Sequence, residues 1–276
     1  MSPLVTALRW HTKKIARGAT ALFSMLSGLL WVKARRKTPH VRVLMYHRFR
    51  DTPRDPFSVR PEEFASQMRW LAQHQLAISP DDFVAFLDGN RALPSGSVLV
   101  SIDDGFLDFL SEAVPIMKRY GIPGICFIPV ADVGDSEHVS WAELAALAAS
   151  GIEVGSHSYN HVSLGHLAEI EVADQLRRSR TELEQRLKHP VRMFAYPYGT
   201  RADHNSSTRN ALRKVGYTLG FVTQHGAVAP DCDRFTIPRI KVEGGESMWM
   251  FRLLVRGGLD AWSVFDRIFW RLQATP

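Results

Sequence analysis

The chain has few cysteines, and its first 50 residues contain no acidic residue. Cys126 and Cys232 are the two thiols among 276 residues. Cys126 lies in an apolar run and is predicted to be a core residue rather than a metal ligand or half of a disulfide, so cysteine use leaves the redox compartment open. Residues 1–50 carry eleven Lys or Arg and no Asp or Glu, which leaves 23 basic against 28 acidic residues in the remainder. The basic excess therefore belongs to the N-terminus and not to the body of the protein, which argues against a nucleic-acid partner.

The N-terminal segment also lacks an apolar run long enough to cross a membrane. Its apolar core, residues 18–32, spans 15 residues, against the roughly 20 that a bilayer requires. Apolar residues recur at helical spacing, and "KARRK" follows where a signal peptide would show a small-residue cleavage site. We therefore expect residues 1–38 to form a basic amphipathic helix that binds an anionic membrane surface through residues 1–37.

Two alternatives to this membrane-surface helix stay open. One is an uncleaved signal anchor, and the other is a soluble helix packed on the body of the protein. In the favoured interpretation the chain is located at the cytoplasmic membrane, peripheral or signal-anchored, with the cytoplasmic face preferred.

From residue 41 onward, short apolar runs alternate with amphipathic stretches, and no repeat or low-complexity tract interrupts them. The strands are expected at residues 41–46, 97–102, 125–130, 152–156, 192–197, 217–222 and 235–240, and the helices at 61–75, 107–120, 140–150, 168–188 and 206–215. This alternation predicts an α/β fold, a distorted barrel of about seven parallel strands. We expect a catalytic domain over residues 39–245, followed by C-terminal amphipathic helices over 246–276.

Polar residues follow the predicted strands at the point where each strand ends. His47 follows the first strand, Asp103 and Asp104 the second, His157 and His161 the fourth. In an α/β barrel the carboxyl ends of the strands share one face, where active sites are built. Residues far apart in the sequence are therefore expected to converge.

Two histidines and one carboxylate make a three-ligand set that leaves a metal position open for water, as in catalytic zinc sites. If Asp104 joins His157 and His161 on a divalent metal, the adjacent Asp103 is free to act as a base toward metal-bound water. Zinc is the expected metal, with cobalt, nickel or manganese as alternatives.

Three motifs occur in the order and spacing of a known family. The segments "SIDDGF", "HSYNH" and "RMFAYPYG" resemble the first three motifs of the polysaccharide deacetylase family, carbohydrate esterase family 4, whose members share the NodB homology domain. The resemblance covers about residues 41–242. It implies a distorted parallel barrel that hydrolyses N-acetyl groups on amino-sugar glycans with the help of one divalent metal.

The resemblance also implies a role for each residue of the motifs. Asp103 would be the general base and Asp104, His157 and His161 the metal ligands. Arg192 would pair with Asp103 and orient it. The backbone N–H of Tyr198 would stabilise the oxyanion, and Tyr196 and Pro197 would complete this oxyanion and substrate-binding segment.

The sequence departs from the family pattern in two places. Ser101 and Ile102 stand where Thr-Phe is usual, and no histidine occurs after His225, so the late Leu-x-x-His motif is absent. "LMYHRF" instead resembles the poly-N-acetylglucosamine deacetylase branch, which implies that His47 is the general acid. "DRFTIPRIKV", residues 233–242, resembles the segment that closes the domain in that branch. Asp233 and Arg239 within it are candidates to support the site, without an assigned role.

The sequence therefore predicts a metal-dependent N-deacetylase that acts on an N-acetylated amino-sugar glycan, either a polysaccharide or a lipid-linked sugar. A catalytically silent glycan-binding module of the same fold is the alternative. A metal phosphoesterase is a third candidate, although such enzymes usually gather more carboxylates and often a second metal.

Overall fold

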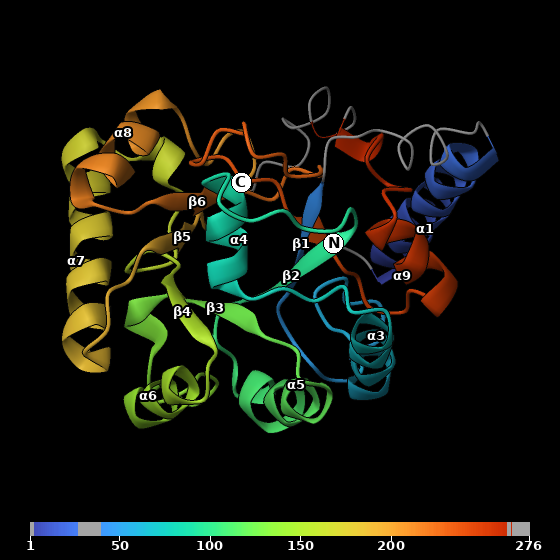
Figure 1. The fold of residues 1–276 in the computed structure, drawn as a ribbon, viewed down its shortest axis with the longest axis horizontal. Coiled ribbons are helices and arrows are strands. Elements are labelled where there is room, and N and C mark those ends of the chain that lie inside the picture. The colour runs from blue at the N-terminus through green and yellow to red at the C-terminus, as the bar shows by residue number, and fades with distance from the viewer. Residues whose placement is uncertain (1–2, 27–39, 264–265, 267–276) are drawn as a thin grey trace.

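Seven parallel strands form one curled sheet in the computed structural model, which describes residues 3–26, 40–263 and 266 (Figure 1). The order of the strands across the sheet is β6-β5-β4-β3-β2-β1-β7. Their bounds are β1 (Val41–Tyr46), β2 (Ser97–Asp103), β3 (Gly124–Ile128), β4 (Glu153–Ser156), β5 (Met193–Ala195), β6 (Leu219–Phe221) and β7 (Ile240–Lys241). The predicted α/β fold with seven parallel strands is confirmed.

The segment that leads into β7 connects the two edges of the sheet. Ile237 forms a parallel bridge to Phe221 of β6, and its N–H donates to Gly220 O at 2.8 Å. Three residues later Ile240 pairs with Leu44 of β1. Only Ile240 and Lys241 pair with β1, because the chain first has to cross from β6 at the other edge of the sheet. This crossing replaces the strand predicted over residues 235–240 and makes the sheet an incomplete barrel.

Helices cover the outer face of the sheet, and one helix fills its hollow (Figure 1). The outer helices are α3 (Pro61–Gln73), α5 (Val114–Tyr120), α6 (Trp141–Ala149), α7 (Glu169–Leu187), α8 (Ser206–Val215) and α9 (Met248–Val255). Inside, α4 (Pro80–Leu87) packs Phe83 against Phe221 with ring centroids 6.0 Å apart. The helix expected over 107–120 is a π-helical turn, Phe109–Ala113, that continues into α5.

The alternation of side chains along each strand decides which residues face the hollow. Leu99 belongs to the inner hydrophobic cluster, whereas Val98 and Val100 belong to the outer one. Asp103 has the same parity as Leu99 and therefore faces inward. The strand thus delivers this carboxylate to the interior of the incomplete barrel at its carboxyl end.

The N-terminal segment forms α1 (Pro3–Leu26), which lies beside α9 (Figure 1). Its side chains at Arg17 and Ala21 are 1% and 0% exposed, so the helix is packed on the body of the protein. No helix among the described residues is both long enough and apolar enough to span a bilayer. "KARRK" and the rest of residues 27–38 lie outside the described part of the chain, as does most of the second helix expected near the C-terminus.

Candidate active site

The residues that follow β1, β2, β4 and β5 meet in one cavity of about 750 Å³ at the carboxyl edge of the sheet. The part of the cavity next to these strand ends is lined by His47, Asp103, Asp104, His157, His161, Tyr196 and Tyr198. The predicted convergence of strand ends is therefore present, with the exception of one arginine described below.

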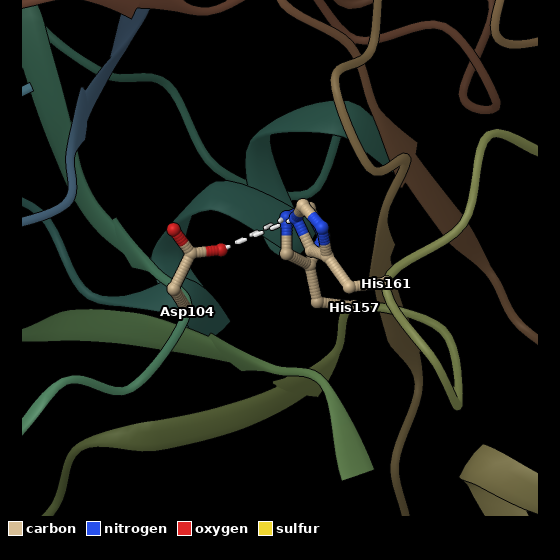
Figure 2. A group of neighbouring side chains, drawn as sticks. All are labelled: Asp104, His157 and His161. Atoms are coloured by element: carbon tan, nitrogen blue, oxygen red, sulfur yellow. Dashed lines mark ion pairs between the residues drawn. The ribbon is translucent and has the colours of Figure 1, made fainter. Parts of the chain in front are cut away.

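Asp104, His157 and His161 form a compact group of candidate metal ligands (Figure 2). One ligand atom from each residue lies within 4.8 Å of the other two. Asp104 Oδ1 is 3.4 Å from His161 Nε2 and 3.6 Å from His157 Nε2. Figure 2 shows the carboxylate on one side and the two imidazoles opposite it, with their nitrogen atoms directed toward the same point.

The hydrogen bonds around this group fit a cation. His157 Nδ1 donates to Ala195 O at 2.8 Å, so its Nε2 carries a lone pair that faces the carboxylate of Asp104. Asp104 Oδ1 is buried, and no donor with hydrogen-bonding geometry reaches it among the described residues. A lone pair and a carboxylate oxygen that face each other repel unless a cation lies between them, and two imidazoles with one carboxylate suit a divalent metal with an open position.

The charges of two of these residues, His157 and Asp104, suit the same interpretation. Burial lowers the pKa of His157 to about 4, so its imidazole is neutral at pH 7, the form that binds a metal. Burial alone would raise the pKa of Asp104, but His161, His47 and His157 outweigh it and hold this pKa well below its ordinary value. Asp104 is therefore ionised.

The backbone at this edge adopts strained conformations. Asp104, Ser158, His161 and Tyr198 have φ angles of 74°, 66°, 52° and 59°, in the left-handed region that costs an L-residue roughly 1–2 kcal/mol. Gly105 follows with a φ of 72°, also in the left-handed region, so the turn after the paired aspartates favours glycine. Strain of this kind often accompanies functional sites, and here it fixes where the ligands point.

Asp103 forms a buried, two-pronged ion pair with Arg239. The distances are 2.6 Å from Nη1 to Oδ1 and 2.8 Å from Nη2 to Oδ2, and the residues are 1% and 0% exposed. Arg239 also donates from Nε to Val222 O and from Nη1 to Ser101 Oγ. Burial alone would raise the pKa of Asp103, but Arg239, His157 and His47 outweigh it and lower this pKa below its ordinary value. The carboxylate is thereby held ionised and in a fixed orientation.

The prediction that Arg192 pairs with Asp103 is wrong. Arg192 immediately precedes β5 and therefore lies at the amino ends of the strands, whereas Asp103 lies at their carboxyl ends. Its Nη2 is 3.5 Å from Asp81 Oδ1 on the protein surface. Asp233 is also away from the cavity, because its half-exposed carboxylate faces Arg209 at 3.9 Å. Of the two unassigned candidates in the closing segment, Arg239 is the one that reaches the site.

His47 lies beside the carboxylate pair. Its Nε2 is 4.0 Å from Asp103 Oδ2, and its ring packs edge-on against Phe57 with centroids 4.8 Å apart. Burial lowers the pKa of His47, Asp104 and Asp103 raise it, and Lys241 lowers it further; the net direction is downward. The imidazole is consequently neutral at pH 7 in the resting site.

The "AYPYG" turn exposes Tyr198 and buries the two residues before it. Tyr198 is 43% exposed, and its ring stands edge-on to His161 with centroids 5.1 Å apart. Among the described residues no acceptor is within hydrogen-bonding distance of its backbone N–H. Tyr196 and Pro197 are buried, and the Tyr196 ring packs on Phe194. Tyr198 is therefore the member of this turn with a free donor beside the metal ligands.

Comparison with known proteins agrees with this architecture. The family model described as polysaccharide deacetylase matches residues 90–220. A poly-beta-1,6-N-acetyl-D-glucosamine N-deacetylase of Staphylococcus epidermidis is 27% identical over 225 residues, which cover 76% of this chain and 74% of that protein. The solved structure of IcaB from Ammonifex degensii superimposes with a TM-score of 0.68 at 27% identity, covering 82% of this chain and 97% of that one.

The Streptococcus pyogenes deacetylase PplD, solved in complex with acetate, shares the fold, with a TM-score of 0.73 at 20% identity over 79% of this chain and 99% of that one. With the motifs, the fold and the site in agreement, the chain carries a polysaccharide deacetylase domain, and it resembles proteins of the poly-N-acetylglucosamine deacetylase branch of that family. A domain of this family indicates a carbohydrate N-deacetylase.

Proposed function

We propose that this protein is a metal-dependent N-deacetylase that hydrolyses the N-acetyl group of amino sugars in a glycan, either a polysaccharide or a lipid-linked sugar. The observation that carries the proposal is the juxtaposition of an Asp–His–His ligand set with a separate carboxylate, Asp103, that Arg239 holds ionised. The relatives named as poly-beta-1,6-N-acetyl-D-glucosamine N-deacetylases support a substrate built from N-acetylglucosamine.

Asp104, His157 and His161 would hold the divalent metal, with zinc expected from the donor set. When bound, such a metal lowers the pKa of a water molecule and polarises the acetyl carbonyl. Asp103 accepts a proton from the attacking water, whose oxygen forms the new bond to the acetyl carbon. The backbone N–H of Tyr198 donates to the oxygen of that carbon as negative charge develops on it.

His47 donates a proton to the amine nitrogen as the carbon–nitrogen bond breaks, so that the products are acetate and a free amino sugar. Because the lowered pKa of His47 leaves it neutral in the resting site, this role requires His47 to gain a proton during the reaction. Asp103, whose Oδ2 lies 4.0 Å from His47 Nε2, has just accepted one. The two side chains together therefore return the proton of the water to the leaving amine.

Acetate release tests the proposed activity. We expect release from an oligomer of β-1,6-linked N-acetylglucosamine, from an undecaprenyl-phosphate N-acetylhexosamine, or from both, and the preferred substrate identifies the class. Removing the metal with a chelator should reduce release to background, and adding back zinc, cobalt, nickel or manganese should restore it. Acetate and metal content are measured on the same samples.

The two other functional classes predict different results in this assay. A catalytically silent binding module would bind the oligomer and the metal without releasing acetate. A metal phosphoesterase would release phosphate from a phosphate ester and bind more than one metal per chain. Either result would contradict the proposed deacetylase.

We also propose that the protein associates with the cytoplasmic membrane as a peripheral protein, through α1 and the residues up to 37. The described side chains that α1 leaves exposed include the apolar Ile15, Leu22, Phe23, Met25 and Leu26. Its basic side chains Lys13, Lys14 and Arg17 instead contact carboxylates of the body. The apolar face would therefore enter the lipid interface, and the "KARRK" that follows in the sequence would meet anionic headgroups.

Replacing Leu22 and Phe23 with glutamate should weaken binding to anionic vesicles at least tenfold. Each apolar side chain that enters the interface contributes up to about 1.5–3 kcal/mol, and a tenfold change is about 1.4 kcal/mol. Flotation with phosphatidylglycerol and phosphatidylcholine vesicles measures the binding, and Ile170→Glu is the control, since Ile170 is 78% exposed on α7. Unchanged flotation of the double variant would contradict this role. A parent protein that binds no vesicles and forms a stable dimer, with a monomeric double variant, would also contradict it, because the apolar face would then be a dimer interface.

A further inference from the structure

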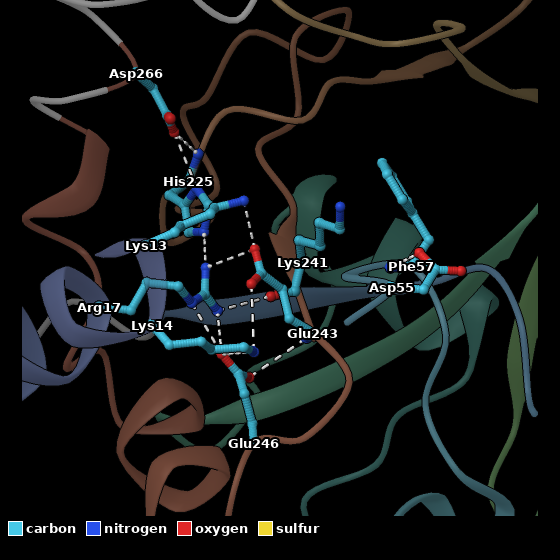
Figure 3. Close-up of polar contacts among 10 residues, drawn as sticks. All are labelled: Lys13, Lys14, Arg17, Asp55, Phe57, His225, Lys241, Glu243, Glu246 and Asp266. Atoms are coloured by element: carbon cyan, nitrogen blue, oxygen red, sulfur yellow. Dashed lines mark hydrogen bonds and ion pairs between the residues drawn. The ribbon is translucent and has the colours of Figure 1, made fainter. Parts of the chain in front are cut away.

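The cavity continues past the candidate metal ligands to a second wall, which lies outside the three motifs that contain those ligands and the oxyanion turn (Figure 3). This wall is built from α1, β7 and the segments near them. Its lining side chains are Lys13, Asp55, Phe57, His225, Lys241, Glu243, Trp262 and Asp266. The N-terminal helix therefore supplies part of the cavity in which the acetyl group would be removed.

The buried acids of this region are already neutralised by cations from α1. Glu243 lies 2.6 Å from Lys13 Nζ and 3.3 Å from Lys14 Nζ. Glu246 accepts from Arg17 at 2.8 Å. Figure 3 shows these three cations gathered around the two glutamates. The direct ion pairs of both glutamates are therefore made with α1.

Lys241 stands in the same wall without such a partner. Among the described residues no carboxylate oxygen lies within 4.0 Å of its ammonium, which instead sits 3.0 Å from the centroid of the Phe57 ring. Burial and the charges of Lys13 and Arg17 lower the pKa of Lys241 to about 7, although Glu243 and Asp55 act in the opposite direction. A partly buried ammonium that borders a cavity and has no carboxylate in direct contact is incompletely stabilised.

Phe57 connects this ammonium to the catalytic residues. The same ring contacts Lys241 and packs edge-on against His47. Lys241 also pairs with Met45 of β1, two residues before His47. A group that binds at Lys241 therefore lies next to the side chain assigned to protonate the leaving amine.

We propose that Lys241, together with Lys13, forms a subsite for an anionic group, phosphate or carboxylate, that the glycan carries beside the sugar to be deacetylated. This inference rests on the proposed function and specifies its substrate class. An anion in the cavity supplies the counter-charge that Lys241 lacks and relieves its repulsion from Lys13. The cavity of about 750 Å³ lies within the size range of ligand pockets, so it has room for a sugar and its charged substituent.

The test compares three derivatives of N-acetylglucosamine, of which one is neutral and two carry an anionic group on the sugar. They are methyl N-acetylglucosaminide, N-acetylglucosamine 1-phosphate and the methyl glycoside of N-acetylglucosaminuronic acid. Acetate release with the metal-loaded protein gives kcat/KM for each probe, and the ratio of anionic to neutral probe is the readout. We expect this ratio to be at least tenfold in the parent and to fall at least tenfold in Lys241→Met, whereas Lys118→Met, an exposed lysine on α5, should leave it unchanged.

If Lys241→Met loses the preference for N-acetylglucosamine 1-phosphate, the subsite binds phosphate. If it loses the preference for the glucosaminuronic acid glycoside, the subsite binds carboxylate. Equal kcat/KM for the three probes in the parent, or a preference that survives in Lys241→Met, would overturn the subsite. Lys241→Met keeps the aliphatic stem and removes a desolvated charge, so we expect it to fold. Lys13→Met provides a second variant with the same expected direction.

A binding measurement separates this inference from the activity itself. If the parent releases acetate neither from these probes nor from the oligomer and the lipid-linked sugar, the proposed function fails, and calorimetric titration of the probes then decides about the subsite. Tighter binding of an anionic probe by the parent than by Lys241→Met would support it, and equal binding would overturn it.

Discussion

Asp103→Asn is expected to reduce acetate release by at least about 10³-fold, within the 10²–10⁴-fold that a positioned general base contributes. Asparagine keeps the shape of the side chain and can accept one hydrogen bond from Arg239, but it cannot take a proton from water. Since Asp104, His157 and His161 are unchanged, metal content should stay at the parent level. Acetate release and metal content per chain are measured together, with a melting curve to verify the fold.

The matched control for this substitution is Asp81→Asn. Asp81 is exposed and contacts Arg192 at the opposite edge of the sheet, so its replacement should leave kcat/KM within about twofold, because exposed pairs of this kind contribute little. Activity of Asp103→Asn close to that of the parent would remove Asp103 from the role of base. Loss of metal along with activity would instead mean that Asp103 acts through the ligand set.

Arg239→Met is expected to destabilise the protein and to change its pH profile. Removing one partner of a buried ion pair typically costs about 3–5 kcal/mol, because the other charge stays buried without compensation. In the parent, Arg239 lowers the pKa of Asp103, and a base is active only above its pKa. Without Arg239 that pKa rises, so the acidic limb of kcat/KM should move to higher pH. Urea denaturation measures the stability, and the pH dependence of acetate release measures the shift.

Arg192→Met is the natural comparison, since the motif resemblance assigns to Arg192 the role that Arg239 has in the structure. Arg192 is on the surface and should change the free energy of unfolding by no more than about 0.5 kcal/mol. Its acidic limb should stay where it is in the parent. If Arg192→Met moved that limb and Arg239→Met did not, the pairing found in the structure would have no functional meaning.

The fold and most of the site residues could be predicted because the signals for them are local. Alternating apolar runs give strands and helices, and parallel strands place all their carboxyl ends at one edge. The candidate residues each end a strand or follow one within five residues, so their position along the chain was sufficient to predict that they meet: His47, Asp103, Asp104, His157 and His161. The strained turns that aim Asp104, His161 and Tyr198 also lie within the motifs themselves.

The arginine partner could not be predicted in the same way. Arg192 and Arg239 both occur near apolar runs, and nothing in their local sequence says which one reaches Asp103. The answer depends on the path of the closing segment, which bonds to β6 at Ile237 and to β1 at Ile240. Arg239 lies between these two points and is directed into the barrel as a result, whereas Arg192 stands at the amino end of β5.

The sequence by itself predicted the class of fold, the candidate metal ligands and the separate roles proposed for Asp103 and Asp104, because each depends on residues within a few positions of a strand end. Only the tertiary structure decided that Arg239 holds Asp103, that the basic residues of α1 face buried glutamates, and that Lys241 borders the catalytic cavity without a carboxylate partner. These contacts join residues 136 or more positions apart. Their formation depends on how the sheet curls and where α1 packs, which no local pattern encodes.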